Sequence, residues 1–393
     1  MYASSLATRS RGTARPFPRL LAGLDPLMLL ASVGLIAASV VVLGEATTGD
    51  IPSQPYYYVW RQVAYGAVGC ALMLAISRID YARLREYRNG IYLATLGSII
   101  AVFAIGSASR GSRRWIELPF FNLQPSELGK LLLVIALAGF VVDNVRRLNE
   151  RQTTVRVLLL GLVPATLVVA QPDLGTGLVY VAATIAILFL AGTRWSHFVV
   201  LACVGSLVAV FALVVAPAVG VEVLKPYQRD RLTAFLHPSA DPRAEGYQIN
   251  QSLTAIGSGG KTGRGEDATQ TKLNFLPEHH TDFIFAVVGE VFGFIGAALV
   301  LSLYALLIWR ALRVVTLAKT LFGALVAGGI TAMLMFQVFV NVGMTIGLAP
   351  ITGVPLPLLS YGGSSVIVTF MSLGLLQSIH ARSRELSLAK AVA

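Results

Sequence analysis

Charged residues are scarce in this chain. Asp, Glu, Lys and Arg make up only 13% of its 393 residues, whereas 55% are hydrophobic. A water-soluble domain carries about 25% charged residues, so this shortage excludes a soluble globule and indicates an integral membrane protein. Cysteine is nearly absent as well: Cys70 and Cys203 both lie in apolar runs, which excludes a disulfide framework. The five histidines show no spacing with cysteine that is typical of a zinc motif.

Long apolar runs are what the sequence has in abundance. A helix of about 20 apolar residues crosses the hydrocarbon core of a bilayer. Such runs predict transmembrane helices near 25–44, 60–77, 90–107, 127–143, 156–171, 175–192, 197–219, 283–310, 320–348 and 361–380. The expected fold is therefore an all-α polytopic membrane protein with about ten transmembrane helices. We expect residues 21–381 to form one membrane-embedded domain.

Basic residues alternate between the loops that connect these runs. Arginine and lysine gather in both terminal segments and in the loops around 78–88, 146–156 and 310–319. Basic loops stay in the cytoplasm, so this alternation places both termini there, as a basic tail of residues 1–20 and a C-terminal tail of residues 382–393. The long loop 220–282, between the seventh and eighth predicted helices, is then extracellular.

The short extracellular loop 109–127 departs from this charge rule. Its three arginines, among them Arg114, lie where arginine should be scarce, so topology does not explain them. Just beyond them, Glu127 and Lys130 are three residues apart and share one helix face. A charge at membrane depth is costly unless it is paired or hydrated. The pair is therefore either a structural ion pair or a lysine that also meets an anion in a hydrated cavity.

Two further residues near the same side of the membrane each allow two interpretations. Arg61, at the extracellular end of the second run, either reaches to the lipid interface or faces a functional site. Asp173 lies in "QPDLGTG", a break between two runs, and either caps the following helix or has a functional role.

The long loop adds more cations. Arg229 and Arg231 occur in "KPYQRDRLTAFLHP", and the segment 255–265, "AIGSGGKTGRG", combines glycine with Lys261 and Arg264. Glycine-rich backbone with cations suits a phosphate, but the segment matches neither a P-loop nor a dinucleotide fingerprint. A flexible, solvated loop is the alternative.

Asp282 ends the polar loop and directly precedes the eighth run, in "FLPEHHTDFIF". At the boundary between water and lipid, such a carboxylate can act as a general base on a sugar hydroxyl. The alternative, favoured when the residue is considered alone, is that Thr281 or Asp282 caps the helix. We interpret His279 and His280 as polar loop residues, and Glu290 as a membrane acid without an assigned partner.

Several stretches together resemble one protein family. They are "GSRRWI", "QPSELGK", "QPDLGTG", "GYQINQSLTAIGSGG", "LNFLPEHHTDFIFAVVGE" and "PLPLLSYGGSS". In this order they are similar to the shape, elongation, division and sporulation (SEDS) family over about residues 25–380. The segment "LNFLPEHHTDF" resembles the rod-shape RodA branch of the family more than the division FtsW branch.

The resemblance implies a ten-helix glycosyltransferase that polymerises lipid II into peptidoglycan at the outer face of the bacterial plasma membrane. It implies a class B penicillin-binding transpeptidase as partner, within the elongation machinery. The motif match implies that Asp282 is the essential acid. By the same match the substrate-binding residues are Arg61, Arg114, Glu127, Lys130, Asp173 and a loop arginine, Arg229 or Arg231. Val291 stands where many members have a second acid, which weakens any role for an acidic pair beside Glu290.

The expected chemistry uses Asp282 as general base and polyprenyl pyrophosphate as leaving group. Charge that develops on the pyrophosphate calls for preorganised cations. No organic cofactor is expected; a divalent cation is possible, but the sequence shows no obvious cage of ligands for one. Three alternatives remain open: an FtsW-type division polymerase, a lipid II flippase or transporter, and a non-catalytic scaffold that activates the transpeptidase.

Overall fold

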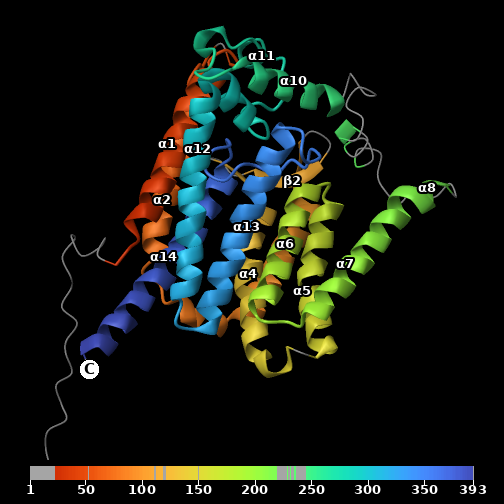
Figure 1. The fold of residues 1–393 in the computed structure, drawn as a ribbon, viewed down its shortest axis with the longest axis vertical. Coiled ribbons are helices and arrows are strands. Elements are labelled where there is room, and N and C mark those ends of the chain that lie inside the picture. The colour runs from red at the N-terminus through yellow and green to blue at the C-terminus, as the bar shows by residue number, and fades with distance from the viewer. Residues whose placement is uncertain are drawn as a thin grey trace, which may run out of the picture.

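The computed structural model describes most of the membrane-embedded chain (Figure 1). It covers residues 23–51, 53–109, 112–117, 121–148, 150–218, 228, 231, 234–235 and 245–392. The predicted basic tail 1–20 and Arg229 lie outside the described residues.

Every predicted apolar run coincides with a long helix or a pair of joined helices. They are α1 (Pro26–Ala46), α2 (Tyr57–Ile76), α3 (Arg88–Ile105), α4 (Pro125–Asp143), α5 (Arg151–Ala170), α6 (Leu174–Leu190), α7 (Trp195–Val210), α12 (Ile284–Leu317), α13 (Leu321–Thr345) and α14 (Gly363–Val392). Helix α7 continues through a π-helical turn, Phe211–Val215, into α8 (Ala216–Ala218). Eight helices in the described residues are long and apolar enough to cross a membrane; α3 and α6 are shorter apolar helices. The prediction of an all-α polytopic membrane protein is confirmed.

Local sequence rules explain where several of these helices begin. The carboxylate of Asp25 accepts hydrogen bonds from the first backbone N–H groups of α1, and Asp173 and Thr320 do the same for α6 and α13. Pro26 and Pro125 occupy the first turns of α1 and α4, where a missing N–H costs nothing. The cap that the sequence predicted at Asp173 is therefore present.

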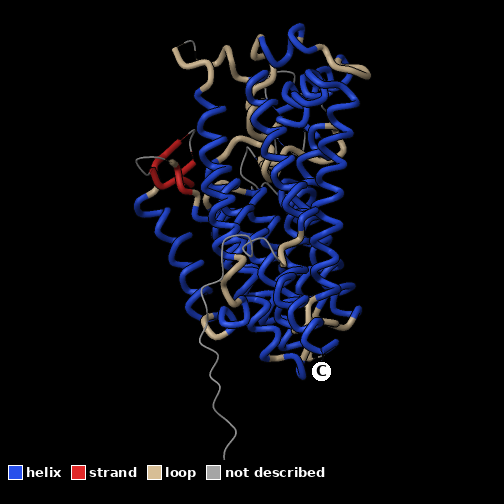
Figure 2. The backbone as a smooth tube through the Cα atoms, turned by 90° about the vertical axis from the view of Figure 1, so that its left-hand side faces the viewer, coloured by secondary structure: helices blue, strands red, loops and turns tan. Residues whose placement is uncertain are grey.

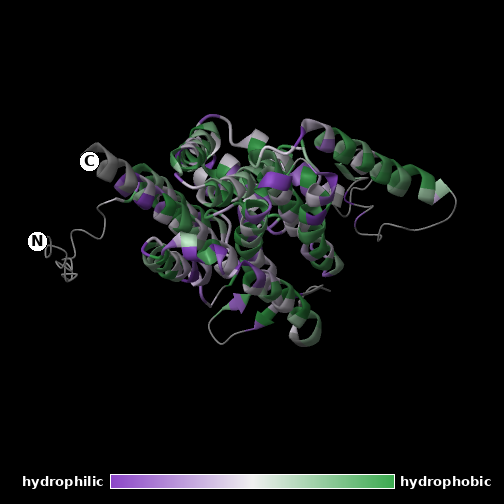
Figure 3. Cartoon of the chain, turned by 90° about the horizontal axis from the view of Figure 1, so that it is seen from below, coloured by the Kyte–Doolittle hydropathy of each residue, from purple (hydrophilic) through white to green (hydrophobic). Residues whose placement is uncertain are grey.

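Burial divides the helices into an inner and an outer group. Helices α4, α13 and α14 carry the most buried positions and form the centre of the bundle. Helix α7 has no buried residue and stands away from the bundle, and apolar residues make up most of its length (Figures 1 and 3). An apolar helix that the protein does not cover is stable only in lipid, which agrees with an integral membrane protein.

The long loop between α8 and α12 is partly helical. Helix α10 (Glu245–Ser258), a 3₁₀ turn (Gly265–Asp267) and α11 (Thr269–Lys272) lie over the end of α12 (Figure 1). Glu290 of α12 accepts hydrogen bonds from the backbone N–H groups of Gln270 and Thr271, at 2.8 and 2.9 Å. The acid that lacked an assigned partner thus anchors the loop to the membrane helices.

The glycine-rich segment of this loop packs against the backbone of α12. A Cβ added at Gly259 would lie 1.9 Å from the carbonyl oxygen of Gly289, and one at Gly263 would lie 2.1 Å from that of Val291. Helix α12 is itself kinked beside this contact, at Gly293, where φ is 63°. The glycines therefore permit a close approach between two backbones. The interpretation of this segment as a flexible, solvated loop is therefore wrong, whereas phosphate binding by Lys261 and Arg264 stays a prediction.

We predict that Gly259→Ala destabilises the protein because the new methyl group has no space against Gly289. Overpacking of this kind costs about 1–3 kcal/mol. Gly257→Ala is the matched control, since nothing lies within 4 Å of a Cβ there and alanine favours the helix. Thermal unfolding in detergent should show a lower melting temperature for Gly259→Ala only; equal melting temperatures would contradict the packing argument.

The arginine-bearing loop between α3 and α4 forms a small sheet that the sequence did not predict. Its strands are β1 (Ser107–Ser109), β2 (Ser112–Glu117) and β3 (Asn122–Leu123), antiparallel in the order β1–β2–β3 (Figure 2). The sheet lies beside the start of α4, and it fixes the position of Arg114 on β2.

Candidate functional site

A polar cavity of about 580 Å³ opens where the loops before α4, α6, α12 and α14 meet. Its lining residues are Arg61, Tyr65, Arg114, Trp115, Glu117, Asn122, Gln124, Glu127, Asp173, Thr176, Arg231, Glu278, His280, Thr281, Asp282, Gly353, Pro355, Tyr361, Gly362, Gly363, Ser364 and Ser365. Another hollow, of about 460 Å³ between α6 and α7, has almost entirely apolar walls and no group suited to acid–base chemistry.

The polar cavity brings together most of the site residues that the sequence predicted. Arg61, Arg114, Glu127, Asp173, Arg231 and Asp282 all line it. Lys130 lies one helical turn deeper, where it contacts Glu127. Of the two loop arginines that the sequence offered, Arg231 lines the cavity. Arg229 lies outside the described residues.

The backbone around Asp282 is held from three sides. Asn341 Nδ2 donates to the carbonyl oxygen of Asp282 at 2.9 Å, and Ser360 Oγ donates to that of Thr281 at 2.6 Å. The backbone N–H of Tyr361 donates to the carbonyl of His280 at 3.0 Å. These bonds come from α13 and the loop that follows it, so tertiary contacts position the segment that carries the acid.

Asp282 does not cap α12. The helix begins at Ile284, its N-cap is Phe283, and no side chain caps it. A Cβ placed on Gly353 would lie 3.6 Å from Asp282 Oδ2 and 3.9 Å from Arg231 Nη1, so the acid and the arginine reach the same part of the cavity wall. The cap interpretation is wrong, and Asp282 instead lines the cavity.

The segment "VPLPLLSYGGSS", 354–365, forms a wall of the cavity. Much of it is buried, and the hydroxyl of Tyr304 donates to the carbonyl of Pro357 at 2.6 Å. Ser39 Oγ donates to the carbonyl of Leu359 at 2.6 Å. The segment thus has a structural role, and it also shapes the site.

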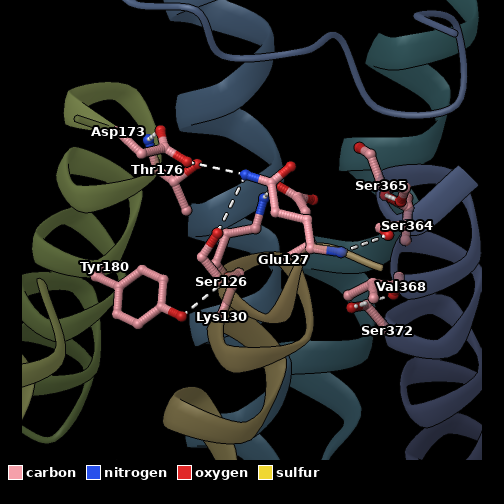
Figure 4. A network of polar contacts seen from close by, with 12 residues as sticks. Ser126, Glu127, Lys130, Asp173, Thr176, Tyr180, Ser364, Ser365, Val368 and Ser372 are labelled. Atoms are coloured by element: carbon pink, nitrogen blue, oxygen red, sulfur yellow. Dashed lines mark hydrogen bonds and ion pairs between the residues drawn. The ribbon is translucent and has the colours of Figure 1, made fainter. Parts of the chain in front are cut away.

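Asp173 belongs to a hydrogen-bonded network at the floor of the cavity (Figure 4). Its Oδ1 accepts from the backbone N–H of Thr176 at 3.1 Å, which is the helix cap, and its Oδ2 accepts from Gln124 Nε2 at 2.9 Å. The backbone N–H of Gln124 in turn donates to Ser364 Oγ at 2.9 Å. Asp173 therefore caps α6 and also links α6, α4 and α14 around the site.

Glu127 and Lys130 form a buried ion pair on α4. Lys130 Nζ lies 2.7 Å from Glu127 Oε1, and each residue is only 3% exposed. The structural ion pair that the spacing predicted is confirmed. Because Glu127 also lines the cavity, the pair places a polar, charge-compensated surface at its base.

The cavity arginines are held by neighbouring groups. The Arg61 guanidinium lies 4.6 Å from the centre of the Tyr57 ring, and Arg61 and Tyr361 line the same cavity. Burial raises the pKa of Tyr361 well above its usual range, so this hydroxyl stays protonated. Arg114 donates to the carbonyl oxygen of Pro172. Arg61 thus faces the cavity rather than serving only as a lipid-interface anchor.

The cavity combines the carboxylate of Asp282 with arginine cations on several walls. Such an arrangement suits a negatively charged ligand whose hydroxyl must lose a proton. Among the described residues, the only group of metal-ligating side chains is Asp50, His279 and His280, of which His280 lines the cavity.

Comparison with known proteins identifies a family for nearly the whole chain. The family model FTSW_RODA_SPOVE, described as "Cell cycle protein", matches residues 24–385. The peptidoglycan glycosyltransferase MrdB of Escherichia coli strain K12 is 39% identical over 365 residues, which cover 93% of this chain and 95% of MrdB.

Solved structures agree with this match. A chain from a structure titled "Structural coordination of polymerization and crosslinking by a peptidoglycan synthase complex" is 31% identical, with a TM-score of 0.78 over 92% of this chain and 98% of that one. The rod shape-determining protein RodA of Thermus thermophilus is 30% identical, with a TM-score of 0.64 over 91% of this chain and 96% of RodA.

Proposed function

This chain belongs to the SEDS family of FtsW, RodA and SpoVE proteins, and we propose that it is a peptidoglycan glycosyltransferase that polymerises lipid II in the cavity around Asp282. The chain is an integral membrane protein with relatives named as peptidoglycan glycosyltransferases. The observation that carries the proposal is the convergence of Asp282 and Arg231 beside Gly353, in one cavity with Arg61 and Arg114.

The substrate explains why the site combines an acid with cations. Lipid II is a sugar pyrophosphate on a polyprenyl tail, so its tail must stay in the bilayer while its sugars reach water. A cavity at the ends of the membrane helices satisfies both needs. Arginine side chains that line it can bind the pyrophosphate through several N–H groups at once.

In the proposed reaction, the Asp282 carboxylate accepts the proton of the 4-hydroxyl on the acceptor's N-acetylglucosamine. That oxygen bonds to the anomeric carbon of the donor's N-acetylmuramic acid, with inversion. The bond from that carbon to the pyrophosphate oxygen breaks, and polyprenyl pyrophosphate leaves. Arg61, Arg114 and Arg231 stabilise the charge that develops on the leaving group, because they are oriented before the reaction begins.

Asp173, Glu127 and Lys130 act from the floor of the cavity. Asp173 and Glu127 both line it, and each carboxylate accepts hydrogen bonds from the protein. In the proposal they maintain the shape and charge of the substrate-binding surface, and the proton transfer belongs to Asp282.

The orientation follows from the substrate and the loop charges. The site lies on the external face of the plasma membrane, ten helices cross it, and both termini are cytoplasmic. A class B penicillin-binding transpeptidase is the proposed partner, supported by the similarity to a chain from a complex whose title couples polymerisation to crosslinking. The match to RodA favours cell elongation; FtsW-type division is the alternative within the family.

Purified protein in liposomes, supplied with lipid II and the transpeptidase partner, tests the proposal. Glycan strands resolved on a gel would establish the transferase. An intact complex that forms no strands but moves labelled lipid II across the bilayer would favour the flippase alternative. An intact complex that does neither would favour a scaffold.

We predict that Asn341→Ala lowers the rate of strand synthesis about 10–100-fold at saturating lipid II. Asn341 Nδ2 donates to the carbonyls of both Asp282 and Val354, at 2.9 and 2.8 Å. Its loss frees the segment that carries the base, and small misplacements of a reacting group cost about this much. Thr345→Ala, which removes a hydroxyl bonded within α13, is the control. Full activity in Asn341→Ala would contradict the positioning role.

A further inference from the structure

Asp50, His279 and His280 form a cluster at the edge of the cavity. Their ligand atoms all lie within 4.8 Å of one another. Asp50 comes from the loop between α1 and α2, whereas the histidines precede α12, so the chain brings the cluster together only on folding. His279 is 5% exposed, and His280 lines the cavity that holds Asp282.

The orientation of the His279 ring defines which nitrogen carries its hydrogen. Nδ1 lies 3.1 Å from the carbonyl oxygen of Leu276, which only accepts, so Nδ1 donates. In the neutral ring, Nε2 then presents its lone pair. It lies 3.3 Å from Asp50 Oδ2, and no hydrogen bond reaches it from the part of the chain that the structure describes. A buried ring nitrogen and a largely covered carboxylate oxygen, both electron-pair donors, thus face each other, and a positive species between them would stabilise the contact.

The distance suits a metal ion better than a proton. A charge-assisted hydrogen bond between an imidazolium and a carboxylate is about 2.7–2.9 Å long. Two ligands that each lie about 2.1 Å from one tetrahedral ion are about 3.4 Å apart. The observed 3.3 Å between Nε2 and Oδ2 is close to this second value. The bond from Nδ1 to a backbone carbonyl is also the contact that orients metal-binding histidines.

We propose that Asp50, His279 and His280 bind a divalent transition-metal ion of the zinc class. Two imidazoles and one carboxylate are ligands that Zn²⁺ accepts, with the fourth position left for water. Mg²⁺ and Ca²⁺ prefer oxygen ligands and are disfavoured here. His280 is the third ligand, because its ring packs against that of His279, with centroids 5.2 Å apart, and its ligand atom lies within 4.8 Å of the other two.

A bound ion would tie the α1–α2 loop to the segment that ends in Asp282. His280 is two residues before Asp282, and its carbonyl accepts the backbone N–H of Tyr361. The ion would therefore connect the α1–α2 loop to this wall of the site.

The test measures metal binding by the full chain in detergent, purified with an affinity tag that contains no histidine. After treatment with a chelator, the protein is titrated with Zn²⁺, Co²⁺ and Mg²⁺ separately. We expect one Zn²⁺ per chain, a melting temperature that rises with Zn²⁺ concentration, visible absorption bands of tetrahedral Co²⁺, and no response to Mg²⁺.

Variants decide whether the ion occupies this cluster. His279→Ala and Asp50→Asn should each weaken Zn²⁺ binding by about 100-fold or more. His197→Ala removes a histidine that bonds to Thr154, away from the cluster, and should bind as the wild type does. Asp50→Asn keeps the shape of the side chain, so it still tests whether this cluster binds Zn²⁺ if His279→Ala fails to fold. A chelated wild type that binds no Zn²⁺, or equal binding by wild type and both cluster variants, would overturn the proposal.

Discussion

Replacing Asp282 with asparagine is expected to lower the rate of glycan-strand synthesis by about 10²–10⁴-fold, the contribution typical of a general base. An amide occupies nearly the same space as the carboxylate but does not accept the proton of the attacking hydroxyl. The backbone bonds from Asn341 and Ser360 to this segment use carbonyl oxygens, so they persist in the variant. Strand synthesis from lipid II, measured on a gel beside the wild type, checks this expectation.

The control for this prediction is Asp267→Asn, which changes an exposed acid of the same loop between α8 and α12. It should retain full activity, and all three proteins should melt at similar temperatures. Strand synthesis by Asp282→Asn at the wild-type rate would move the base elsewhere in the cavity, with Asp173 and Glu127 as the next acids to replace.

The second large effect is expected from the buried ion pair. Lys130→Met leaves the Glu127 carboxylate 3% exposed and without its cation, which should lower the free energy of unfolding by about 3–5 kcal/mol. The double variant Glu127→Gln with Lys130→Met removes both charges and should recover most of that loss. Thermal and denaturant unfolding in detergent measure both variants.

A surface ion pair provides the comparison. Arg85 pairs with Asp143 at 2.7 Å, but its side chain is 45% exposed. Arg85→Met should therefore cost only about 0–1 kcal/mol, since solvent screens the interaction. A Lys130→Met protein as stable as the wild type would show that water reaches Glu127 and that the pair is hydrated.

Short-range contacts are the features that the sequence predicted correctly. Asp173 caps α6, and Glu127 pairs with Lys130, as spacing alone predicted, because each partner lies within one helical turn. The predicted cap at Asp282 is wrong, because α12 begins at Ile284. Contacts with α13 and the loop after it hold the segment that carries Asp282. Glycine content misled in the same way: Gly259 and Gly263 pack on α12, a partner that local sequence does not specify.

The sequence by itself determined the membrane class, the positions of the apolar helices and the acids and cations available to the site. Hydropathy, helix capping and one-turn ion pairs depend on neighbouring residues, so a linear pattern is sufficient to predict them. The tertiary structure alone decided that Asp282 and Arg231 meet beside Gly353, that Glu290 anchors the α10–α11 loop, and that Asp50 faces His279. Each of these contacts joins segments far apart in the chain, and only the packing of the helices brings them within reach.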